Sequence, residues 1–274
     1  MRVTMLSIVI PAYNEVGRIQ ETITDVRQYL ATRAFDFEII VAVDGNDGTA
    51  DVVRALAMEE PRIRLLDERS RRGKGYAIRR GVGVARGDVI GFIDADNKTP
   101  IDDFEIIEPL LREGYQVVIG SRAMAGSRIE RRQPWYRRVG SRGFGVIMHA
   151  MVGLRDIVDT QCGFKFFTRR AALDLFSRQR IDGYMFDVEV LSLARRASLS
   201  IAQVPVRWRD DGDSRLRLFS GNVRNLVDLF TIRFSRHGSA PSVFVDSVDA
   251  VSDEDVGDDG RPTLDVSHSS ENRR

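Results

Sequence analysis

Two carboxylates, Asp94 and Asp96, follow a short apolar run in a sequence of 274 residues. The run Val89–Ile93 predicts a buried strand, and the two acids follow it in a turn that ends at Pro100. Just past a strand end, the chain can curl so that both carboxylates approach one hard cation, which takes oxygen ligands. Mg²⁺ in particular prefers one or two carboxylates plus phosphate oxygens to an all-protein site. The alternative is a local role, in which Asp96 forms an Asx turn and caps a helix.

The elements that position these acids alternate between strand and helix. Apolar patterns predict strands at 6–10, 37–43, 63–67 and 89–93, and helices at 16–31, 50–58 and 76–85. Polar clusters follow the strands at Tyr13–Glu15, Asp44–Asp47, Arg71–Lys74 and Asp94–Asp96. This rhythm predicts an α/β fold with a Rossmann-like, mostly parallel sheet flanked by helices. Because such sheets bind ligands at the carboxyl ends of their strands, the four clusters are expected to converge on one site.

The second half of the chain is less regular. Its predicted elements are a helix at 104–112, a strand at 116–119, a short apolar helix at 144–152, helices at 170–176 and 186–196, and a strand at 201–208. The arginine-rich stretch 123–142 carries Trp135 and Tyr136, a combination that suits nucleic acid or an anionic membrane surface. The stretch 143–153 is either ordinary core or a shallow membrane insertion. The amphipathic stretch 215–236 is either a helix packed on the domain or an interfacial membrane helix.

The net charge of +1 hides a segregation of charge along the chain. From Gly238 to the end, nine acidic residues stand against three arginines, so this tail carries −6 and the body about +7. A basic body attracts phosphates, anionic head groups or nucleic acid. The tail 238–274 lacks periodicity and is predicted to be disordered.

The single cysteine, Cys162, excludes an internal disulfide and fits a reducing compartment. The apolar run 5–10 is too short for a signal peptide, and no apolar run reaches the roughly 20 residues that span a bilayer. Two glycine-containing stretches only weakly resemble nucleotide-binding motifs. Gly81–Gly87 has the wrong spacing for a dinucleotide site, and Gly73-Lys74-Gly75 lacks the flanking residues of a phosphate loop. A dehydrogenase and a P-loop enzyme are therefore disfavoured.

Short motifs across residues 4–236 carry a family resemblance. Pro11-Ala12-Tyr13-Asn14-Glu15, Asp44-Gly45-Asn46-Asp47-Gly48-Thr49 and Asp94-Ala95-Asp96 resemble the nucleotide-sugar domain of the family 2 glycosyltransferases. Gly120-Ser121-Arg122, Asp159-Thr160-Gln161-Cys162-Gly163-Phe164-Lys165, Phe186-Asp187-Val188-Glu189, Val204-Pro205-Val206 and the loop Arg209–Leu216 resemble the dolichyl- (polyprenyl-) phosphate sugar synthases. The run Thr160–Lys165 is most similar to the dolichyl-phosphate glucosyltransferases. The chain departs from the pattern at Val43, where the family usually has the first of two aspartates, and the following loop is one residue shorter.

The resemblance implies a GT-A type fold over 1–237, with a nucleotide-sugar part (1–120) and an acceptor part (121–237) that ends in the amphipathic helix. It implies inverting transfer of a hexose to polyprenyl or dolichyl phosphate, with Mg²⁺ or Mn²⁺ as cofactor. UDP-glucose is the first choice of donor and GDP-mannose the alternative. Two alternatives from other classes are a non-catalytic nucleotide-binding peripheral membrane protein and a nucleic-acid-binding protein.

The resemblance also assigns roles to residues. The nucleotide sugar is expected to contact a set drawn from both halves of the chain: Pro11, Tyr13, Glu15, Asp44, Lys74, Asp94, Arg209 and Arg215. Asp94 and Asp96 are the expected metal ligands. The acceptor phosphate is expected to contact Arg122, Arg137 and Lys165, and the catalytic set is Asp96, Arg122, Lys165 and Asp187. Asp187 is a base, an orienting partner of Lys165, or a helix N-terminal acid favoured by the dipole. We expect a peripheral protein at the cytoplasmic membrane face, contacting anionic lipid and no nucleic acid, with an oligomeric state that the sequence leaves open.

Overall fold

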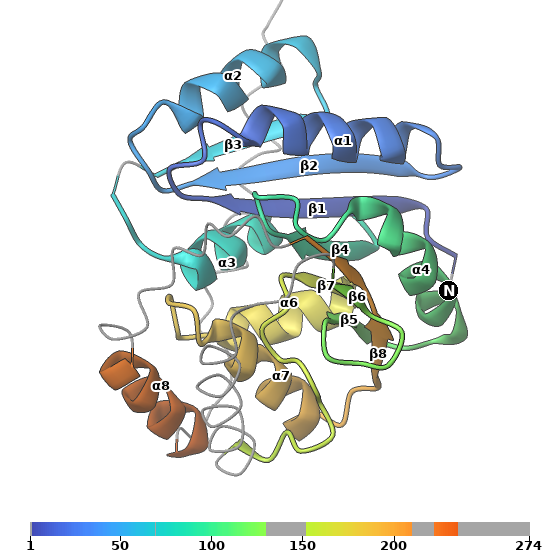
Figure 1. The fold of residues 1–274 in the computed structure, drawn as a ribbon, viewed down its shortest axis with the longest axis vertical. Coiled ribbons are helices and arrows are strands. Elements are labelled where there is room, and N and C mark those ends of the chain that lie inside the picture. The colour runs from blue at the N-terminus through green and yellow to red at the C-terminus, as the bar shows by residue number, and fades with distance from the viewer. Residues whose placement is uncertain (1, 69, 130–151, 210–221, 235–274) are drawn as a thin grey trace, which may run out of the picture. The chain divides into compact units, whose positions relative to one another are not determined.

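The computed structural model describes residues 2–68, 70–129, 152–209 and 222–234. Seven strands form the main sheet: β1 (Met5–Ala12), β2 (Asp36–Val43), β3 (Ile63–Asp67), β4 (Val89–Ile93), β5 (Val117–Ser121), β7 (Phe164–Thr168) and β8 (Ile201–Pro205). Their order is β3-β2-β1-β4-β7-β5-β8 (Figure 1). Neighbours are parallel except at β7, which is antiparallel to β4 and to β5. The predicted α/β class with a mostly parallel sheet is confirmed.

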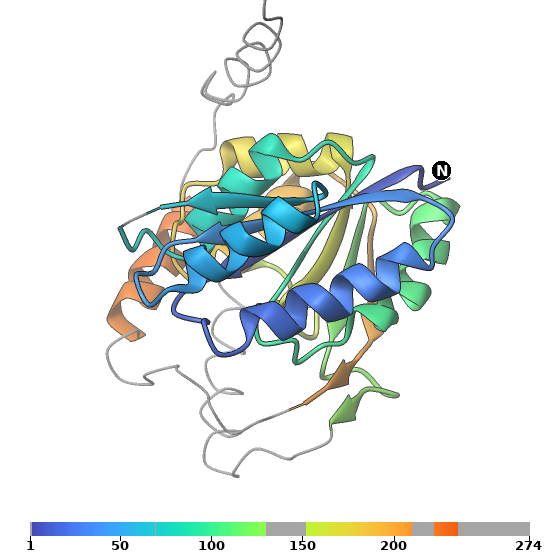
Figure 2. The ribbon, with the colours of Figure 1, turned by 90° about the horizontal axis from the view of Figure 1, so that it is seen from above.

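Helices cover both faces of this sheet (Figure 2). They are α1 (Ile19–Ala31), α2 (Thr49–Glu59), α3 (Lys74–Val84), α4 (Phe104–Glu113, preceded by a short 3-10 turn at Ile101–Asp103), α6 (Arg169–Arg178) and α7 (Phe186–Arg196). A further helix, α8 (Asn222–Phe234), packs against α7. Apolar side chains of α1, α2 and α4 pack on one face, and those of α3, α6 and α7 on the other. A small parallel pair, β6 (Arg128–Ile129) and β9 (Arg207–Trp208), lies apart from the main sheet.

Burial on both faces explains the uninterrupted apolar runs of the central strands. In β1, Ile8 and Ile10 belong to one core cluster while Val9, between them, belongs to the other. A strand covered on both sides needs apolar residues at every position, so it lacks the alternation of a half-exposed strand. Gly91 in β4 faces the ring of Phe166, and a Cβ atom at position 91 would lie 2.3 Å from that ring. The glycine therefore lets β7 lie close to β4.

The structure corrects several element predictions. The sequence does not predict strand β7 (Phe164–Thr168), because Lys165 interrupts its apolar run. Strand β1 continues through Pro11, which aligns with Ala42 of β2, although Pro11 was expected to stop the strand. Helix α1 begins at Ile19 instead of residue 16, and the predicted strand 201–208 is broken at Val206 into β8 and β9.

Some predicted segments lie largely or wholly outside the described residues. These are the arginine-rich stretch from residue 130 onward, most of 143–153, the loop 210–221 and the tail 238–274. The proposed division at 120/121 and the disordered tail therefore stay predictions. Within the described ranges, no helix combines the length and apolar character needed to cross a bilayer.

Candidate active site

The first part of the candidate site lies at the carboxyl ends of β1 and β2. Asp44, 5% exposed, directly follows β2 and accepts backbone N–H bonds from Arg72 (3.2 Å) and Gly73 (2.9 Å). The Arg71 guanidinium lies over the Tyr13 ring, with 4.1 Å between its Cζ atom and the ring centroid. The loop between β3 and α3 is therefore held against the end of β2. The sequence predicted roles for Tyr13 and Asp44, and it placed Arg71 in a cluster expected at this site without giving it a role.

The segment after β1 is fixed by the start of α2. The Glu15 backbone N–H donates to Thr49 Oγ1 (2.9 Å), and the Thr49 hydroxyl donates to Asp47 Oδ1 (2.5 Å). Asp47 Oδ2 accepts the backbone N–H of Val16 (3.1 Å). Burial opposes ionisation of Asp47, but these hydrogen bonds hold its pKa below the usual range. Two strand-end loops that are far apart in sequence are thereby joined.

The two carboxylates after β4 each face a lysine. Asp94 Oδ1 lies 2.6 Å from Lys74 Nζ, and Asp96 Oδ2 lies 3.0 Å from Lys98 Nζ. Partial burial opposes ionisation of Asp94, but the Lys74 ammonium, with Arg122 and Lys165 further away, holds the pKa of Asp94 below its usual range. Burial also disfavours the charge on Lys74, and Asp94 followed by Asp187 outweighs it, so the pKa of Lys74 is raised. The Asp94 carboxylate is thus ionised and attracts cations.

Asp94 and Asp96 fit a Mg²⁺ or Mn²⁺ ion in their chemistry. Both are hard oxygen donors, and the cationic group beside each shows that the site favours positive charge. Among the described residues, no group of three or more His, Cys, Asp or Glu side chains could hold a metal. A pair of carboxylates suits an ion whose remaining ligands are water and substrate phosphates. The fit is to a metal that arrives with a phosphate-containing substrate.

Arg122, which follows β5, makes a forked ion pair with Asp159. Its Nε donates to Asp159 Oδ2 (2.8 Å), its Nη2 donates to Oδ1 (2.9 Å), and its backbone N–H also reaches Oδ2 (2.9 Å). Burial disfavours ionisation of Asp159, but the Arg122 guanidinium holds the pKa of this carboxyl below its usual range. The Arg122 side chain remains 31% exposed and its Cζ atom lies 5.6 Å from the centroid of the Trp208 ring. Asp159 therefore orients the Arg122 guanidinium group. The sequence predicted no role of its own for Asp159.

Lys165 and Asp187 form a buried pair beneath this region. Their side chains are 1% and 4% exposed, and Lys165 Nζ contacts both Asp187 Oδ1 and the Cys162 carbonyl oxygen, the latter at 2.7 Å. Burial raises the pKa of Asp187 above its usual range, with the charges of Lys165 and Lys74 acting against it. Burial likewise raises the pKa of the neighbouring Cys162 thiol to about 12. Lys165 thus adds positive charge from within the protein.

Gly163 provides the space that Asp94 occupies. A Cβ atom at position 163 would lie 2.0 Å from Asp94 Oδ2 and 2.2 Å from its Cγ. Such an approach is impossible, so any side chain at 163 displaces the carboxylate. Because that carboxylate is the end of a partly exposed side chain, it can move without disturbing the core.

We expect Gly163→Ala to lower the turnover of the expected hexosyl transfer by about 10- to 100-fold. This factor is equivalent to roughly 1.4–2.8 kcal/mol of lost transition-state stabilisation. The unfolding midpoint should fall little, since Asp94 yields instead of the core. Steady-state rates and thermal denaturation measure the two effects. Gly17→Ala is the matched control, because a Cβ atom there meets nothing within 4 Å. Equal activity of the two variants would contradict the role given to Gly163.

The structure places the predicted residues as follows. Pro11, Tyr13, Glu15, Asp44, Lys74, Asp94, Asp96, Arg122, Lys165 and Asp187 lie along a connected series of strand ends and contacts. The Arg209 backbone N–H donates to the Lys98 carbonyl oxygen (2.9 Å), which brings the end of β9 to the Asp96 turn. Arg137 and Arg215 lie outside the described residues.

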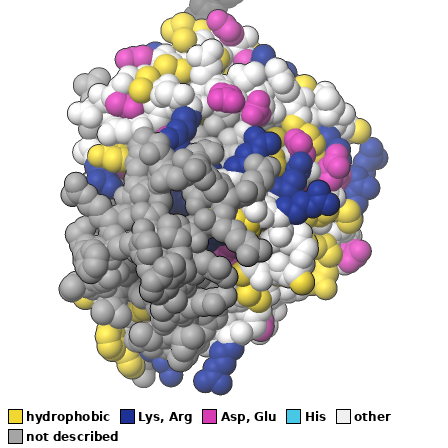
Figure 3. All heavy atoms as spheres, in the orientation of Figure 1, with side chains coloured by type: hydrophobic (Ala, Val, Ile, Leu, Met, Phe, Trp, Pro, Cys, Tyr) yellow, Lys and Arg dark blue, Asp and Glu magenta, His cyan; other side chains and the backbone are white. Residues whose placement is uncertain are grey.

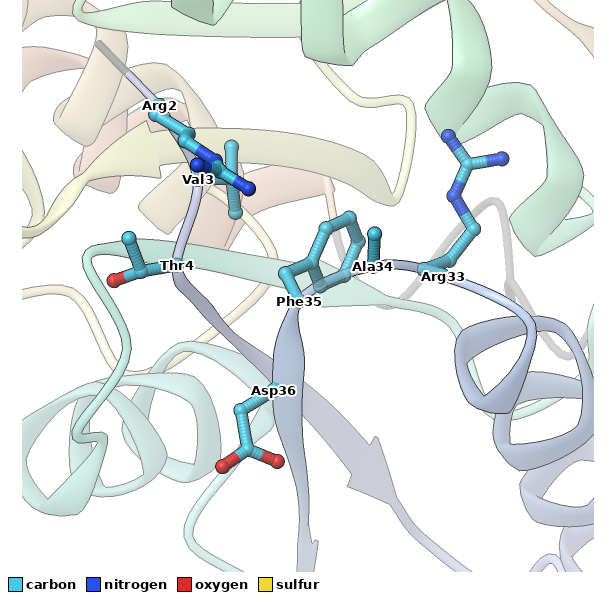
Figure 4. Close-up of a pocket in the computed structure, with 7 residues that line it drawn as sticks. All are labelled: Arg2, Val3, Thr4, Arg33, Ala34, Phe35 and Asp36. Atoms are coloured by element: carbon cyan, nitrogen blue, oxygen red, sulfur yellow. The ribbon is translucent and has the colours of Figure 1, made fainter.

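A hollow of about 360 Å³ lies at the other edge of the sheet, where β1 and β2 begin (Figure 4). Its lining includes Arg2 and Asp36, and the Arg33 guanidinium there is engaged by Glu105 and Glu108. Its charged groups do not converge, so we assign it no role. On the face shown in Figure 3, lysine and arginine side chains are interspersed with acidic ones, which fits a surface of ion pairs.

Comparisons with known proteins found similar sequences and a similar fold. Residues 7–176 match the family described as Glycosyl transferase family 2. The chain is 39% identical over 236 residues to a dolichyl-phosphate beta-glucosyltransferase of Trichomonas vaginalis, covering 82% of this chain and 69% of that protein. It is 33% identical over 242 residues to the Homo sapiens dolichyl-phosphate beta-glucosyltransferase, covering 83% and 74%.

A solved structure is similar in fold. It is glucosyl-3-phosphoglycerate synthase from Mycobacterium tuberculosis in complex with Mn²⁺, UDP and glucosyl-3-phosphoglycerate, with a TM-score of 0.63 and 24% identity. The match covers 84% of this chain and 80% of that one. Similarity at this level of identity bears on the fold alone, and it confirms the predicted GT-A type.

Proposed function

Because the chain belongs to glycosyl transferase family 2, we propose that it transfers glucose from a nucleotide sugar to dolichyl or polyprenyl phosphate, with inversion at the anomeric carbon. The observation that carries this proposal is the agreement with relatives named dolichyl-phosphate beta-glucosyltransferases. Seven of them are 32–39% identical over 82–85% of this chain. The part of the chain that matches the family, residues 7–176, includes Arg122, Asp159 and Lys165.

UDP-glucose is the proposed donor. Tyr13 and Arg71 offer a flat aromatic and guanidinium surface beside the buried Asp44 carboxylate, which suits a nucleobase and its ribose. Lys74, which lies beside Asp94, is the proposed contact of the diphosphate, and the exposed Arg209 lies beside the Asp96 turn. The M. tuberculosis enzyme of similar fold was crystallised with UDP and Mn²⁺, so the ligands proposed here are ones that this fold can bind. GDP-mannose remains the alternative donor.

The reaction leaves a nucleoside diphosphate, which needs its charge neutralised. A divalent ion held by Asp94 and Asp96 would supply that neutralisation as a Lewis acid. Lys74 and Lys98 lie next to these carboxylates and bring positive charge to the same place. Gly163 leaves room for the Asp94 carboxylate beside Lys74. The donor half of the site thus stabilises the departing group by fixed charges.

The acceptor phosphate needs positioning more than activation. One of its oxygens, already ionised at neutral pH, attacks the anomeric carbon as the bond to the diphosphate breaks. Asp159 engages Nε and Nη2 of Arg122, so the guanidinium is held in one orientation with its remaining donors available. Lys165 acts through its field, since its side chain is 1% exposed and its ammonium contacts Asp187. Arg137 is proposed as a further phosphate contact from the sequence alone.

Helix α8 is the proposed membrane contact. Leu229 and Ile232 are buried against the domain, and Arg196 donates to the Ile232 carbonyl oxygen (2.8 Å). The opposite side presents Val227, Phe230 and Phe234, which are 58%, 55% and 72% exposed. The two phenylalanine rings stack, with centroids 6.2 Å apart. Packed on one side and apolar on the other, the helix fits an interfacial position on a bilayer.

We expect Phe230→Ser/Phe234→Ser to weaken binding to vesicles of phosphatidylcholine and phosphatidylserine by about 30-fold, from roughly 2 kcal/mol of lost apolar burial. Turnover on a short, water-soluble polyprenyl phosphate should stay close to that of the wild type. Vesicle sedimentation and parallel activity assays measure the two quantities. Met58→Ser is the matched control, because Met58 in α2 is 80% exposed but belongs to another part of the surface. Unchanged vesicle binding by the double variant would exclude α8.

A donor screen tests the proposed function. Protein is mixed with Mg²⁺ or Mn²⁺, polyprenyl phosphate and labelled UDP-glucose or GDP-mannose, and lipid-linked label is measured. Label from UDP-glucose supports the proposal, and label from GDP-mannose alone would replace the donor. Nucleotide binding without transfer from either donor would favour the non-catalytic alternative. The cytoplasmic location stays a prediction that this experiment does not address.

A further inference from the structure

The stretch Gly73-Lys74-Gly75 does not form a phosphate loop, but it begins α3 in an unusual way. The helix has no side-chain cap at its start. Instead, the backbone N–H groups of Gly75 and Tyr76 donate to the carbonyl oxygen of Asp182, at 2.8 and 3.3 Å. Since the first N–H groups of a helix lack partners within it, Asp182 caps α3 from a distant part of the chain.

Both glycines beside Lys74 are required for this approach. Gly73 has φ +116°, and a Cβ atom there would lie 2.4 Å from the Asp182 carbonyl oxygen. At Gly75 a Cβ atom would lie 2.4 Å from the Ile181 carbonyl oxygen. The segment 179–182, which we call the clasp, therefore lies directly on the backbone around Lys74.

Glu189 in α7 holds the clasp from inside the protein. Its side chain is 1% exposed, and its two carboxylate oxygens accept the backbone N–H groups of Arg180 (3.1 Å to each) and Ile181 (2.9 Å). On the outer side, Arg79 Nη2 lies 2.8 Å from Asp182 Oδ1. A buried carboxylate that accepts several N–H bonds fixes the backbone it contacts. The clasp is thus gripped from both sides.

We infer that Glu189 is a positioning residue that aims Lys74 at Asp94 through the clasp. Lys74 is the first residue of α3, where the positive end of the helix dipole disfavours an ammonium group. The direction of the Lys74 side chain therefore depends on the backbone at residues 73–75, and the clasp fixes that backbone. The inference rests on the proposed function in one respect, the contact of Lys74 with the donor diphosphate. Its structural half can be tested without any substrate.

The first test is amide hydrogen exchange in Glu189→Gln. The variant keeps the size of the side chain, but its amide group brings donors to face the N–H groups of the clasp. Exchange at Gly75 and Tyr76 should rise at least tenfold, while exchange in β1 stays unchanged. Glu38→Gln is the matched control, since Glu38 is another buried carboxylate with backbone, serine and arginine partners far from Lys74. Unchanged exchange at Gly75 and Tyr76 in Glu189→Gln would overturn the inference.

The second test is a double-mutant cycle on the donor reaction. Glu189→Gln should lower kcat/KM for UDP-glucose about tenfold, or roughly 1.4 kcal/mol, and leave the KM for polyprenyl phosphate unchanged. In a Lys74→Met background it should lower kcat/KM little further, because the residue acts through Lys74. Full additivity of the two changes would overturn the inference.

A third variant guards against misfolding of Glu189→Gln. Arg79→Gln loosens the clasp from its exposed side and should shift exchange and donor kcat/KM in the same direction by a smaller factor. A change in exchange confined to α7, or wild-type values in Arg79→Gln for both measurements, would count against the clasp. If the wild type transfers sugar from no donor, the proposed function fails, and the exchange result still decides the role of Glu189.

Discussion

Replacement of Asp96 by alanine is expected to lower hexosyl transfer by about 10³-fold or more, a loss typical of removing a key electrostatic contact to a leaving group. Asp96 lies in the turn after β4, and its side chain is 23% exposed and lies 3.0 Å from Lys98 Nζ. It contributes little to the core, so the unfolding midpoint should stay within about 3 °C of the wild type, which corresponds to roughly 1 kcal/mol. Initial rates with labelled donor and thermal unfolding test both statements.

The control for Asp96→Ala is Asp67→Ala. Asp67 ends β3, is 32% exposed and pairs with Arg54 at 2.9 Å, so it is another strand-end carboxylate with a cationic partner. Its replacement should leave more than half of the activity. Mn²⁺ binding, followed by paramagnetic resonance in the presence of UDP, should weaken only in the Asp96 variant. Wild-type turnover in Asp96→Ala would contradict the metal assignment.

The sequence predicts correctly those helices and strands whose first and last residues are marked by residues within or next to the element. Strands β3 and β4 and helix α7 match the predicted ranges residue for residue, because each is an apolar or amphipathic run with clear flanking signals. Strand β7 differs, since it is defined by its partners. Lys165 interrupts its apolar run, and its place between β4 and β5 comes from long-range pairing.

The same distinction applies to the site. Asp44 and Asp94 could be predicted to lie at the same edge of the sheet, because parallel strands bring their carboxyl ends to one edge. The partners that orient these groups come from other segments, and the motifs that contain them do not say which group each partner contacts. Asp159 beside Arg122, Gly163 beneath Asp94 and Glu189 beneath the clasp all belong to this kind. Spacing therefore predicts which side chains converge, and only the folded structure shows what aims them.

Lys165 illustrates how this changes a proposed role. It was expected to contact the acceptor phosphate, and the structure places its ammonium group against Asp187 and the Cys162 carbonyl oxygen. Burial raises the pKa of Asp187 even though Lys165 opposes this effect, so desolvation outweighs their attraction. Such a pair adds little to stability as a whole, but loss of one partner leaves the other charge uncompensated.

Asp187→Asn is accordingly expected to lower the free energy of unfolding by about 3 kcal/mol or more, because Lys165 is left buried without its counter-charge. Urea denaturation at pH 7 should show a lower midpoint with an unchanged slope. The control is Asp174→Asn, which removes an exposed carboxylate paired with Arg178 and should cost less than about 0.5 kcal/mol.

The double variant Lys165→Met/Asp187→Leu separates stability from function. Removal of both charges should restore much of the stability that Asp187→Asn loses, since apolar side chains of similar size can replace a buried pair. Transfer should stay impaired, because the positive charge near Asp94 is absent. Recovery of both stability and transfer would mean that the pair serves only the fold, and the acceptor half of the site would then rest on Arg122 and its Asp159 partner.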